Sequence, residues 1–171
     1  MHSNETRAAG VAASGGSRQV LTFSLGCETY GVDILRVKEI RGWSPVTRIP
    51  HSPDFMLGVL NLRGAIMPIL DLRVLFALPS AEFTPATVII VLSLNTAEGQ
   101  RECGVVADSV RDVVDIALDN VRPVPSMNAG NASEFLEGIT TIDEQMLILL
   151  NPDDLVARTL SPPPAISNEA A

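Results

Sequence analysis

The feature that most constrains the fold is an internal repeat. The stretch 55–71 aligns without a gap with the stretch 135–151, and two upstream matches follow in the same order at smaller offsets: Gly31-Val32 and Val37-Lys38-Glu39-Ile40 with Gly104-Val105 and Val110-Arg111-Asp112-Val113, and Phe23-Ser24-Leu25 with Leu92-Ser93-Leu94. The offset grows only between the matches, where loops absorb insertions. Chance agreement of apolar positions is the alternative, but the glycines and the Lys/Arg–Glu/Asp pair match as well. We therefore predict two similar β units packed together.

Short strands are predicted throughout both repeats. Apolar residues alternate with polar ones over 21–25, which is typical of a half-buried strand, and the continuous apolar run 88–94 indicates a strand buried on both faces. Turns at 26–28 and at Gly64 indicate hairpins, and Pro68 must lie at an edge or at a non-hydrogen-bonded position. About five strands per repeat favour a mainly β fold of two small barrels that share a core, because closure removes exposed edges.

Two short helices are also expected. Ser52 and Asn151 each precede a proline, so each is a plausible N-cap with proline at the first helical position. The Asp108-Ser109 pair is interpreted as a hairpin turn.

Composition divides the chain into a folded body and two tails. Residues 1–17 are rich in Ala, Gly and Ser, and 159–171 contain three consecutive prolines, so both are expected to be flexible. The folded domain is predicted at 18–158, with repeat halves at about 19–76 and 87–156. No apolar run approaches the roughly 18 residues of a membrane span, and the N-terminus does not resemble a signal peptide. Cytoplasm is therefore the expected location.

Charge and cysteine usage exclude several function classes. The net charge is −8, which argues against nucleic acid as a partner because phosphate binding depends on Lys and Arg. Cys27 and Cys103 belong to no CxxC pair, so we interpret both as small packed side chains rather than as a disulfide or metal site. No catalytic motif occurs, and neither a cofactor nor a metal is expected. The cluster Asp108, Asp112 and Asp115 could serve acid/base chemistry or hold a cation, but a solvated strand face explains it more simply.

The segment 58–64 is the sharpest local signal for a binding surface. In an alternating strand Leu60 and Leu62 share one face, so Asn61 and Arg63 are presented on the other. Arg63 at a hairpin tip suits a protein contact. The alternative is an exposed arginine, paired with Asp71, that contributes little.

A second candidate is the amphipathic segment 37–40. Val37 and Glu39 could form a half-exposed apolar patch with an acidic residue that orients a partner. Val110 and Val113 hold the matching places in the second repeat. Two such patches on neighbouring barrels could line one groove for an amphipathic helix or a helical hairpin.

These residues resemble the bacterial chemotaxis coupling protein family, CheW. The resemblance rests on the segments 25–26, 30–34, 37–42 and 47–50, most strongly on Gly58-Val59-Leu60-Asn61-Leu62-Arg63-Gly64 followed by Pro68-Ile69-Leu70-Asp71-Leu72-Arg73, and it continues through 104–108, 110–113 and 146–149. It covers roughly 19–156.

The resemblance implies two SH3-like five-stranded barrels and a non-catalytic adaptor. Such adaptors couple the cytoplasmic tips of methyl-accepting chemotaxis receptors to the histidine kinase CheA, and they bind a CheA regulatory domain of their own fold. Membrane association would be only indirect, by recruitment to receptor clusters at the inner membrane. The residues implied in receptor or kinase binding, with Asn61 added from the strand pattern, are Val37, Glu39, Gly58, Asn61, Arg63, Val110 and Val113.

Two other functions remain open at this stage. A similar adaptor could serve a non-flagellar pathway, such as twitching motility or biofilm signalling, which gene neighbourhood could separate. An enzyme or ligand-binding domain on the same fold is supported only by the aspartate cluster.

Overall fold

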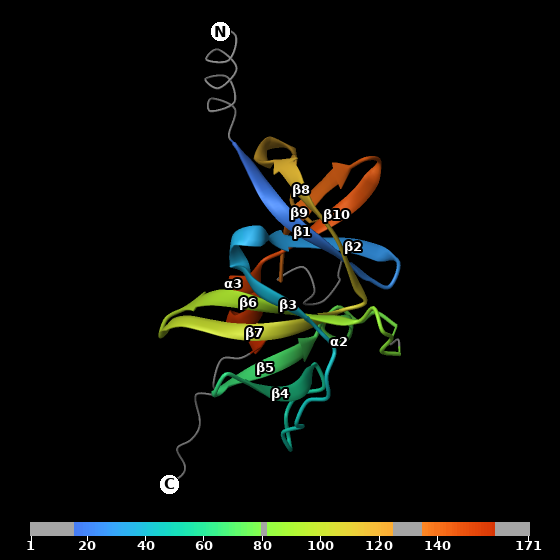
Figure 1. Cartoon of the computed structure of the whole chain (residues 1–171). Helices are drawn as coiled ribbons and strands as arrows, with labels where there is room; N and C mark the ends of the chain where they lie inside the picture. The colour runs from blue at the N-terminus through green and yellow to red at the C-terminus, as the bar shows by residue number, and fades with distance from the viewer. Residues whose placement is uncertain (1–15, 80–81, 125–134, 160–171) are drawn as a thin grey trace, which may run out of the picture.

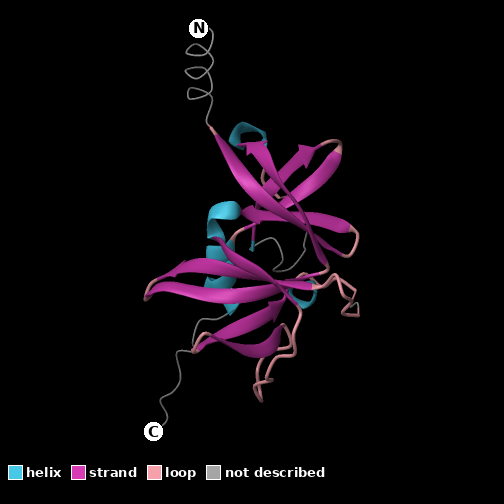
Figure 2. Ribbon diagram, in the orientation of Figure 1, coloured by secondary structure: helices cyan, strands magenta, loops and turns pink. Residues whose placement is uncertain are grey.

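The computed structural model describes residues 16–79, 82–124 and 135–159, and within them the chain is mainly β (Figures 1 and 2). The strands are β1 (Ser17–Leu25), β2 (Glu28–Asp33), β3 (Val37–Gly42), β4 (Met56–Leu62), β5 (Ala65–Asp71), β6 (Val88–Thr96), β7 (Gly99–Ala107), β8 (Ser109–Ala117), β9 (Leu136–Ile142) and β10 (Gln145–Leu150). Short helices are η1 (Ile34–Arg36), α2 (Leu72–Leu75), η2 (Leu118–Asn120) and α3 (Pro152–Thr159). The predicted tails lie almost entirely outside the described residues.

The strands form two five-stranded sheets, each an SH3-like barrel, stacked one above the other in Figure 1. We call them the β1 barrel, with strand order β8-β1-β2-β10-β9, and the β6 barrel, with order β3-β6-β7-β5-β4. Each barrel takes strands from both repeats. In the β6 barrel, β3, β4 and β5 of the first repeat join β6 and β7 of the second. In the β1 barrel, β8, β9 and β10 of the second repeat join β1 and β2 of the first. The two orders become identical when each strand is replaced by its repeat counterpart.

Two glycines allow the exchange, because each lies where strands of different repeats pair in parallel. Gly31 pairs with Leu149 between β2 and β10, and Gly104 pairs with Ile69 between β7 and β5. A Cβ on Gly31 would lie 2.4 Å from Val20 Cγ1, and one on Gly104 would lie 2.7 Å from Ile69 Cδ1. The matched glycines thus leave room for the interior side chains of their barrels.

Apolar side chains gather in three clusters. Each barrel has an interior, around Val20, Ile116, Leu147 and Leu149 in the β1 barrel and around Met67, Ile69, Ile89, Val91 and Val106 in the β6 barrel. The largest cluster lies between the barrels and includes Phe23, Tyr30, Leu92, Val105 and Leu155. Strand β6 supplies alternate residues to the barrel interior and to the shared cluster, which confirms that it is buried on both faces.

Ion pairs connect segments on either side of the shared cluster. Arg73, whose side chain is only 3% exposed, donates to Asp108 Oδ1 at 3.1 Å, and Asp108 Oδ2 accepts from the backbone N–H of Gly26. Arg36 donates to both carboxylate oxygens of Asp153, which also accepts from the backbone N–H of Asn95.

The local predictions have mixed outcomes. Asn151 caps α3, since its Oδ1 accepts from the N–H groups of Asp153 and Asp154. The helix expected after Ser52 is wrong: the Ser52 hydroxyl donates to the carbonyl of Ile49 in a turn, so it is not free to cap a helix. The hairpin at Asp108 is wrong as well, because β7 and β8 lie in different barrels and the residue joins them.

Pro68 lies inside the sheet at a position that needs no donor. It faces Val59 in the β4–β5 ladder, and the N–H and C=O of Val59 bond to Thr47 on the opposite side. The proline therefore occupies a non-hydrogen-bonded pair, as predicted.

Candidate protein-binding surface

The tip of the β4–β5 hairpin presents Arg63. Arg63 and Gly64 both have positive φ, 53° and 88°, and Asn61 Oδ1 accepts from the N–H of Gly64 at 3.0 Å. Leu60 and Leu62 pack against the interior of the β6 barrel, whereas Asn61 and Arg63 are exposed. The turn therefore holds the arginine on a short, fixed loop. The structure also confirms that Asn61 and Arg63 point away from the face of Leu60 and Leu62, as the alternation predicted.

Arg63 pairs with Glu39 on β3, the strand at the opposite edge of the same five-stranded sheet. Its Nη2 lies 2.5 Å from Glu39 Oε1, and Arg41 Nη1 approaches the second oxygen at 3.5 Å. The hydrogen bond from Arg63 lowers the pKa of Glu39 and raises the pKa of Arg63. The side chain of Arg63 nevertheless stays 73% exposed, so the guanidinium can still bond a partner.

The alternative pairing of Arg63 with Asp71 is wrong. Asp71 is buried, where it caps α2 by accepting from the N–H of Arg73 and also faces the Arg73 side chain at 3.5 Å. The sequence offered two carboxylates to Arg63. Closure of the β6 barrel, which brings the edge strand β3 to the β4–β5 hairpin, selects Glu39.

Gly58 is buried in β4, where the strand packs closely against the backbone of Thr47. Its φ is 154°, and an added Cβ would lie 2.4 Å from the carbonyl oxygen of Thr47. Next to Gly58, the backbone N–H of Thr47 donates to the carbonyl of Val59, and the N–H of Val59 donates to the carbonyl of Thr47. Gly58 therefore acts through backbone packing and cannot itself present a side chain to a partner.

The three predicted valines divide between the barrels. Val37 on β3 and Val110 on β8 are half-buried and pack against the shared cluster, which brings them to the seam between the barrels. Val113 on β8 is 49% exposed. The structure therefore brings Glu39, Asn61 and Arg63 together on one barrel, with Gly58 behind them, and leaves Val110 and Val113 on the other.

Two exposed apolar residues of the β6 barrel were missed from the sequence. Ile40 is 42% exposed on β3, on the face opposite Glu39, and Ile66 is 64% exposed on β5, where it faces Asn61 just after the tip. Their alternation with buried neighbours was visible, but a short apolar residue in a strand gives no sign of which face remains uncovered. An ion pair close to an uncovered apolar side chain such as Ile66 is a common composition for a protein interface.

The aspartate cluster does not form a site. Asp108 faces Arg73 and Gly26, whereas Asp112 and Asp115 lie on β8. Within the described ranges, no group of three or more His, Cys, Asp or Glu side chains is arranged to hold a metal ion. Cys27 is exposed and Cys103 is buried, both as free thiols, and burial raises the pKa of Cys103 to about 12.

No helix in the part of the chain that the structure describes is long and apolar enough to cross a membrane.

Comparison with known proteins agrees with this architecture. The model of the CheW-like domain family matches residues 19–160. A chemotaxis protein CheW of Klebsiella aerogenes is 46% identical over 140 residues, which is 82% of each chain, and a probable chemotaxis protein CheW of Rhizobium etli is 36% identical over 85% of this chain and 92% of its own. The crystal structure of the scaffolding protein TtCheW from Thermoanaerobacter tengcongensis superposes with a TM-score of 0.73 at 30% identity, covering 81% of this chain and 86% of that one.

Two interleaved SH3-like barrels with an exposed ion pair and uncovered apolar side chains define the class of scaffold proteins that work through binding surfaces. The chain belongs to the CheW-like family, and it is an adaptor of bacterial chemosensory signalling.

Proposed function

We propose that the chain couples methyl-accepting chemotaxis receptors to the histidine kinase CheA, and that it does so in the cytoplasm at receptor clusters. The observation that carries the proposal is the Glu39–Arg63 pair, exposed on a fixed hairpin tip of a CheW-like domain. Relatives named as chemotaxis proteins favour a chemotaxis pathway over the other pathways that use similar adaptors.

The surface is suited to orienting a partner. Glu39 and Arg63 offer an acceptor and a donor side by side, and Ile66, which faces Asn61, supplies apolar area close to them. Polar groups of this kind contribute specificity and register, while buried apolar contacts contribute affinity. We assign this β6-barrel surface to one partner, with Asn61 at its margin and Gly58 supporting it.

The seam between the barrels is the proposed second surface. Val37 and Val110 lie along it, half-buried, and Val113 extends the apolar area onto β8. An amphipathic receptor helix laid there would bury these side chains. An adaptor with two surfaces raises the effective concentration of its partners for each other, and receptor conformation can then bias kinase activity without any chemistry in the adaptor.

The test is co-sedimentation with receptor-containing membranes, with and without CheA, while kinase autophosphorylation is followed. Arg63→Glu places two carboxylates together, so binding to one partner should fall by about tenfold or more. The melting temperature should stay within about 2 °C, because exposed pairs contribute little.

Arg101→Glu is the matched control. Arg101 also forms an exposed pair with a glutamate, Glu98, but on the β6–β7 hairpin. Loss of binding in both variants would indicate a general charge effect, and normal binding by Arg63→Glu would refute the assigned surface.

A further inference from the structure

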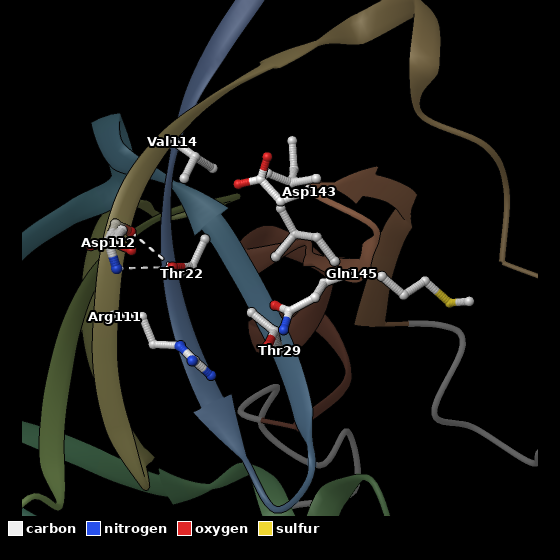
Figure 3. A pocket seen from close by; sticks show the side chains of 10 residues that line it. Thr22, Thr29, Arg111, Asp112, Val114, Asp143 and Gln145 are labelled. Carbon is white, nitrogen blue, oxygen red and sulfur yellow. Dashed lines mark hydrogen bonds between the residues drawn. The ribbon is translucent and has the colours of Figure 1, made fainter.

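The β1 barrel carries a hollow of about 120 Å³ between β8 and the tip of the β9–β10 hairpin (Figure 3). Its lining residues are Thr22, Thr29, Arg111, Asp112, Val114, Ile142, Asp143, Gln145, Met146 and Leu147. Asp143 comes from the hairpin tip and lies across from Asp112 on β8, with Arg111 on the same strand as Asp112 (Figure 3). The hollow thus combines two carboxylates and one guanidinium with an aliphatic wall.

This hollow is the repeat counterpart of the Glu39–Arg63 pair. Asp112 stands where Glu39 stands, and Asp143 stands where Arg63 stands. The edge strands agree in detail, since β3 has a register shift between Val37 and Glu39 and the β1–β8 ladder shifts at the same place. The two sites are therefore one backbone frame carrying different side chains.

The side chains at the two hairpin tips have opposite charge. In the β6 barrel the tip supplies a guanidinium that bonds the carboxylate on the edge strand. In the β1 barrel the tip supplies a second carboxylate, and two carboxylates repel rather than bond. The tip of the β9–β10 hairpin therefore supplies no guanidinium, and a hollow lies between this tip and β8.

Arg111 lines the hollow from β8 rather than from the tip, and two carboxylates with one guanidinium leave the hollow with an excess of one negative charge. The counterpart of Arg111 is Lys38, which lies 3.6 Å from Glu102, and Thr29 occupies the position of Glu102 in the β1 barrel. Meanwhile the Thr22 hydroxyl donates to the backbone carbonyl of Asp112 and accepts from its N–H, so the strand carrying Asp112 is fixed (Figure 3).

An uncovered apolar side chain also lines the hollow. Met146 is 60% exposed. Its counterpart is Ile66, which is 64% exposed and faces Asn61 in the β4–β5 ladder. A partner that covered Met146 would bury apolar area next to the carboxylates.

We infer that the hollow is a docking site for an arginine side chain presented by a protein partner, next to an aliphatic residue. The planar guanidinium can bond both carboxylates at once, which a lysine ammonium does less well. The methylene stem would pack on Val114, Ile142 and Leu147. This site is separate from the Glu39–Arg63 surface and does not depend on which receptor or kinase binds there.

The test is an NMR titration of the full isotope-labelled chain with the blocked tripeptide Ile-Arg-Val. The same peptide with citrulline in place of arginine is the neutral isostere. We expect saturable shifts at the amides of Thr22, Asp112 and Gln145, and binding about tenfold weaker for citrulline, because the charge-assisted bonds are lost.

Three variants locate the contact. Asp143→Asn should weaken binding of the arginine peptide by about fivefold or more. Asparagine tolerates the positive φ of 51° at this position. Asp143→Arg should abolish binding, because it supplies the guanidinium internally. Glu144→Gln is the matched control, since its carboxylate is on the same tip but does not line the hollow, and its affinity should stay within about twofold.

Equal affinity for the citrulline peptide would overturn the inference. So would shifts centred on Glu39, unchanged binding by Asp143→Asn, or the absence of saturable shifts. None of these results bears on receptor coupling, which is measured with Arg63→Glu.

Discussion

The two barrels keep the same backbone but carry opposite charges at their hairpin tips. On the β6 barrel, Glu39 on the edge strand meets Arg63 on the hairpin tip; on the β1 barrel, Asp112 and Asp143 hold the same places. Strand order, parallel pairing, close glycines and edge-strand bulges are common to both. Duplication thus conserves what packing requires, and the surface is left to diverge.

The ion pairs near the seam also differ in charge, because the helix after each hairpin supplies Arg73 in one repeat and Asp153 in the other. Arg73 in α2 bonds Asp108, the residue just before β8, whereas Asp153 in α3 bonds Arg36, the residue just before β3. In each case the carboxylate also accepts a backbone N–H, from Gly26 or from Asn95. A pair of opposite charges works equally well in either orientation, so only its complementarity is retained.

The largest expected effect is on the free energy of unfolding, and it should differ between these two ion pairs because one is more deeply buried. Arg73→Ala removes a side chain that is 3% exposed and leaves Asp108 without it, so the free energy of unfolding should fall by about 4 kcal/mol. Arg36→Ala acts on side chains that are 24% and 35% exposed, so the loss should be about 1 kcal/mol. Urea denaturation of both variants measures the difference, and equal losses would contradict the role assigned to burial.

A smaller loss of stability is expected when the matched hairpin glycines, Gly58 and Gly138, are replaced. Gly58→Ala meets the Thr47 carbonyl at 2.4 Å with φ at 154°, so it should cost about 3 kcal/mol. Gly138→Ala meets the Arg122 carbonyl at 2.7 Å without a positive φ, so about 2 kcal/mol is expected. Gly42→Ala is the control, because no atom lies within 4 Å of its Cβ position. A larger cost at Gly138 than at Gly58 would show that strain at positive φ is not the difference.

The smallest effect is a pH dependence carried by one pair. The hydrogen bond from Arg36 lowers the pKa of Asp153 below its ordinary 3.8. A carboxylate with a lowered folded pKa stabilises the fold above its unfolded pKa, and that stability is lost as pH falls through the folded pKa. Asp153→Asn should therefore lose less stability than the wild type on acidification below about pH 4.

Arg36→Ala removes the cause of the lowered Asp153 pKa, so the free energy of unfolding should also fall less steeply on acidification in this variant. If either variant follows the wild-type curve between pH 3 and pH 6, the pair does not contribute through this carboxylate.

The local pattern predicted the strands but misjudged some of their connections. Alternation over 21–25 and the apolar run at 88–94 gave β1 and β6, because side-chain period and burial are local properties. Ser52 and Asp108 were misinterpreted, since a turn and a strand connection between barrels use the same residue types as a cap and a hairpin. The assignment of Val37, Glu39, Gly58, Asn61, Arg63, Val110 and Val113 to receptor or kinase binding stays a prediction.

The sequence by itself determined the duplication, the strand content and the residues of the exposed tip, because these follow from the order and spacing of side chains. Only the tertiary structure decided which repeat supplies which strand to each barrel, since the same repeats could pair within or between halves. It also decided that Arg63 meets Glu39 rather than Asp71, and that Asp112 meets Asp143 across a hollow. Both results depend on the closure of each barrel, which brings the edge strand β3 or β8 to the hairpin at the other edge of its sheet, and long-range packing sets that closure.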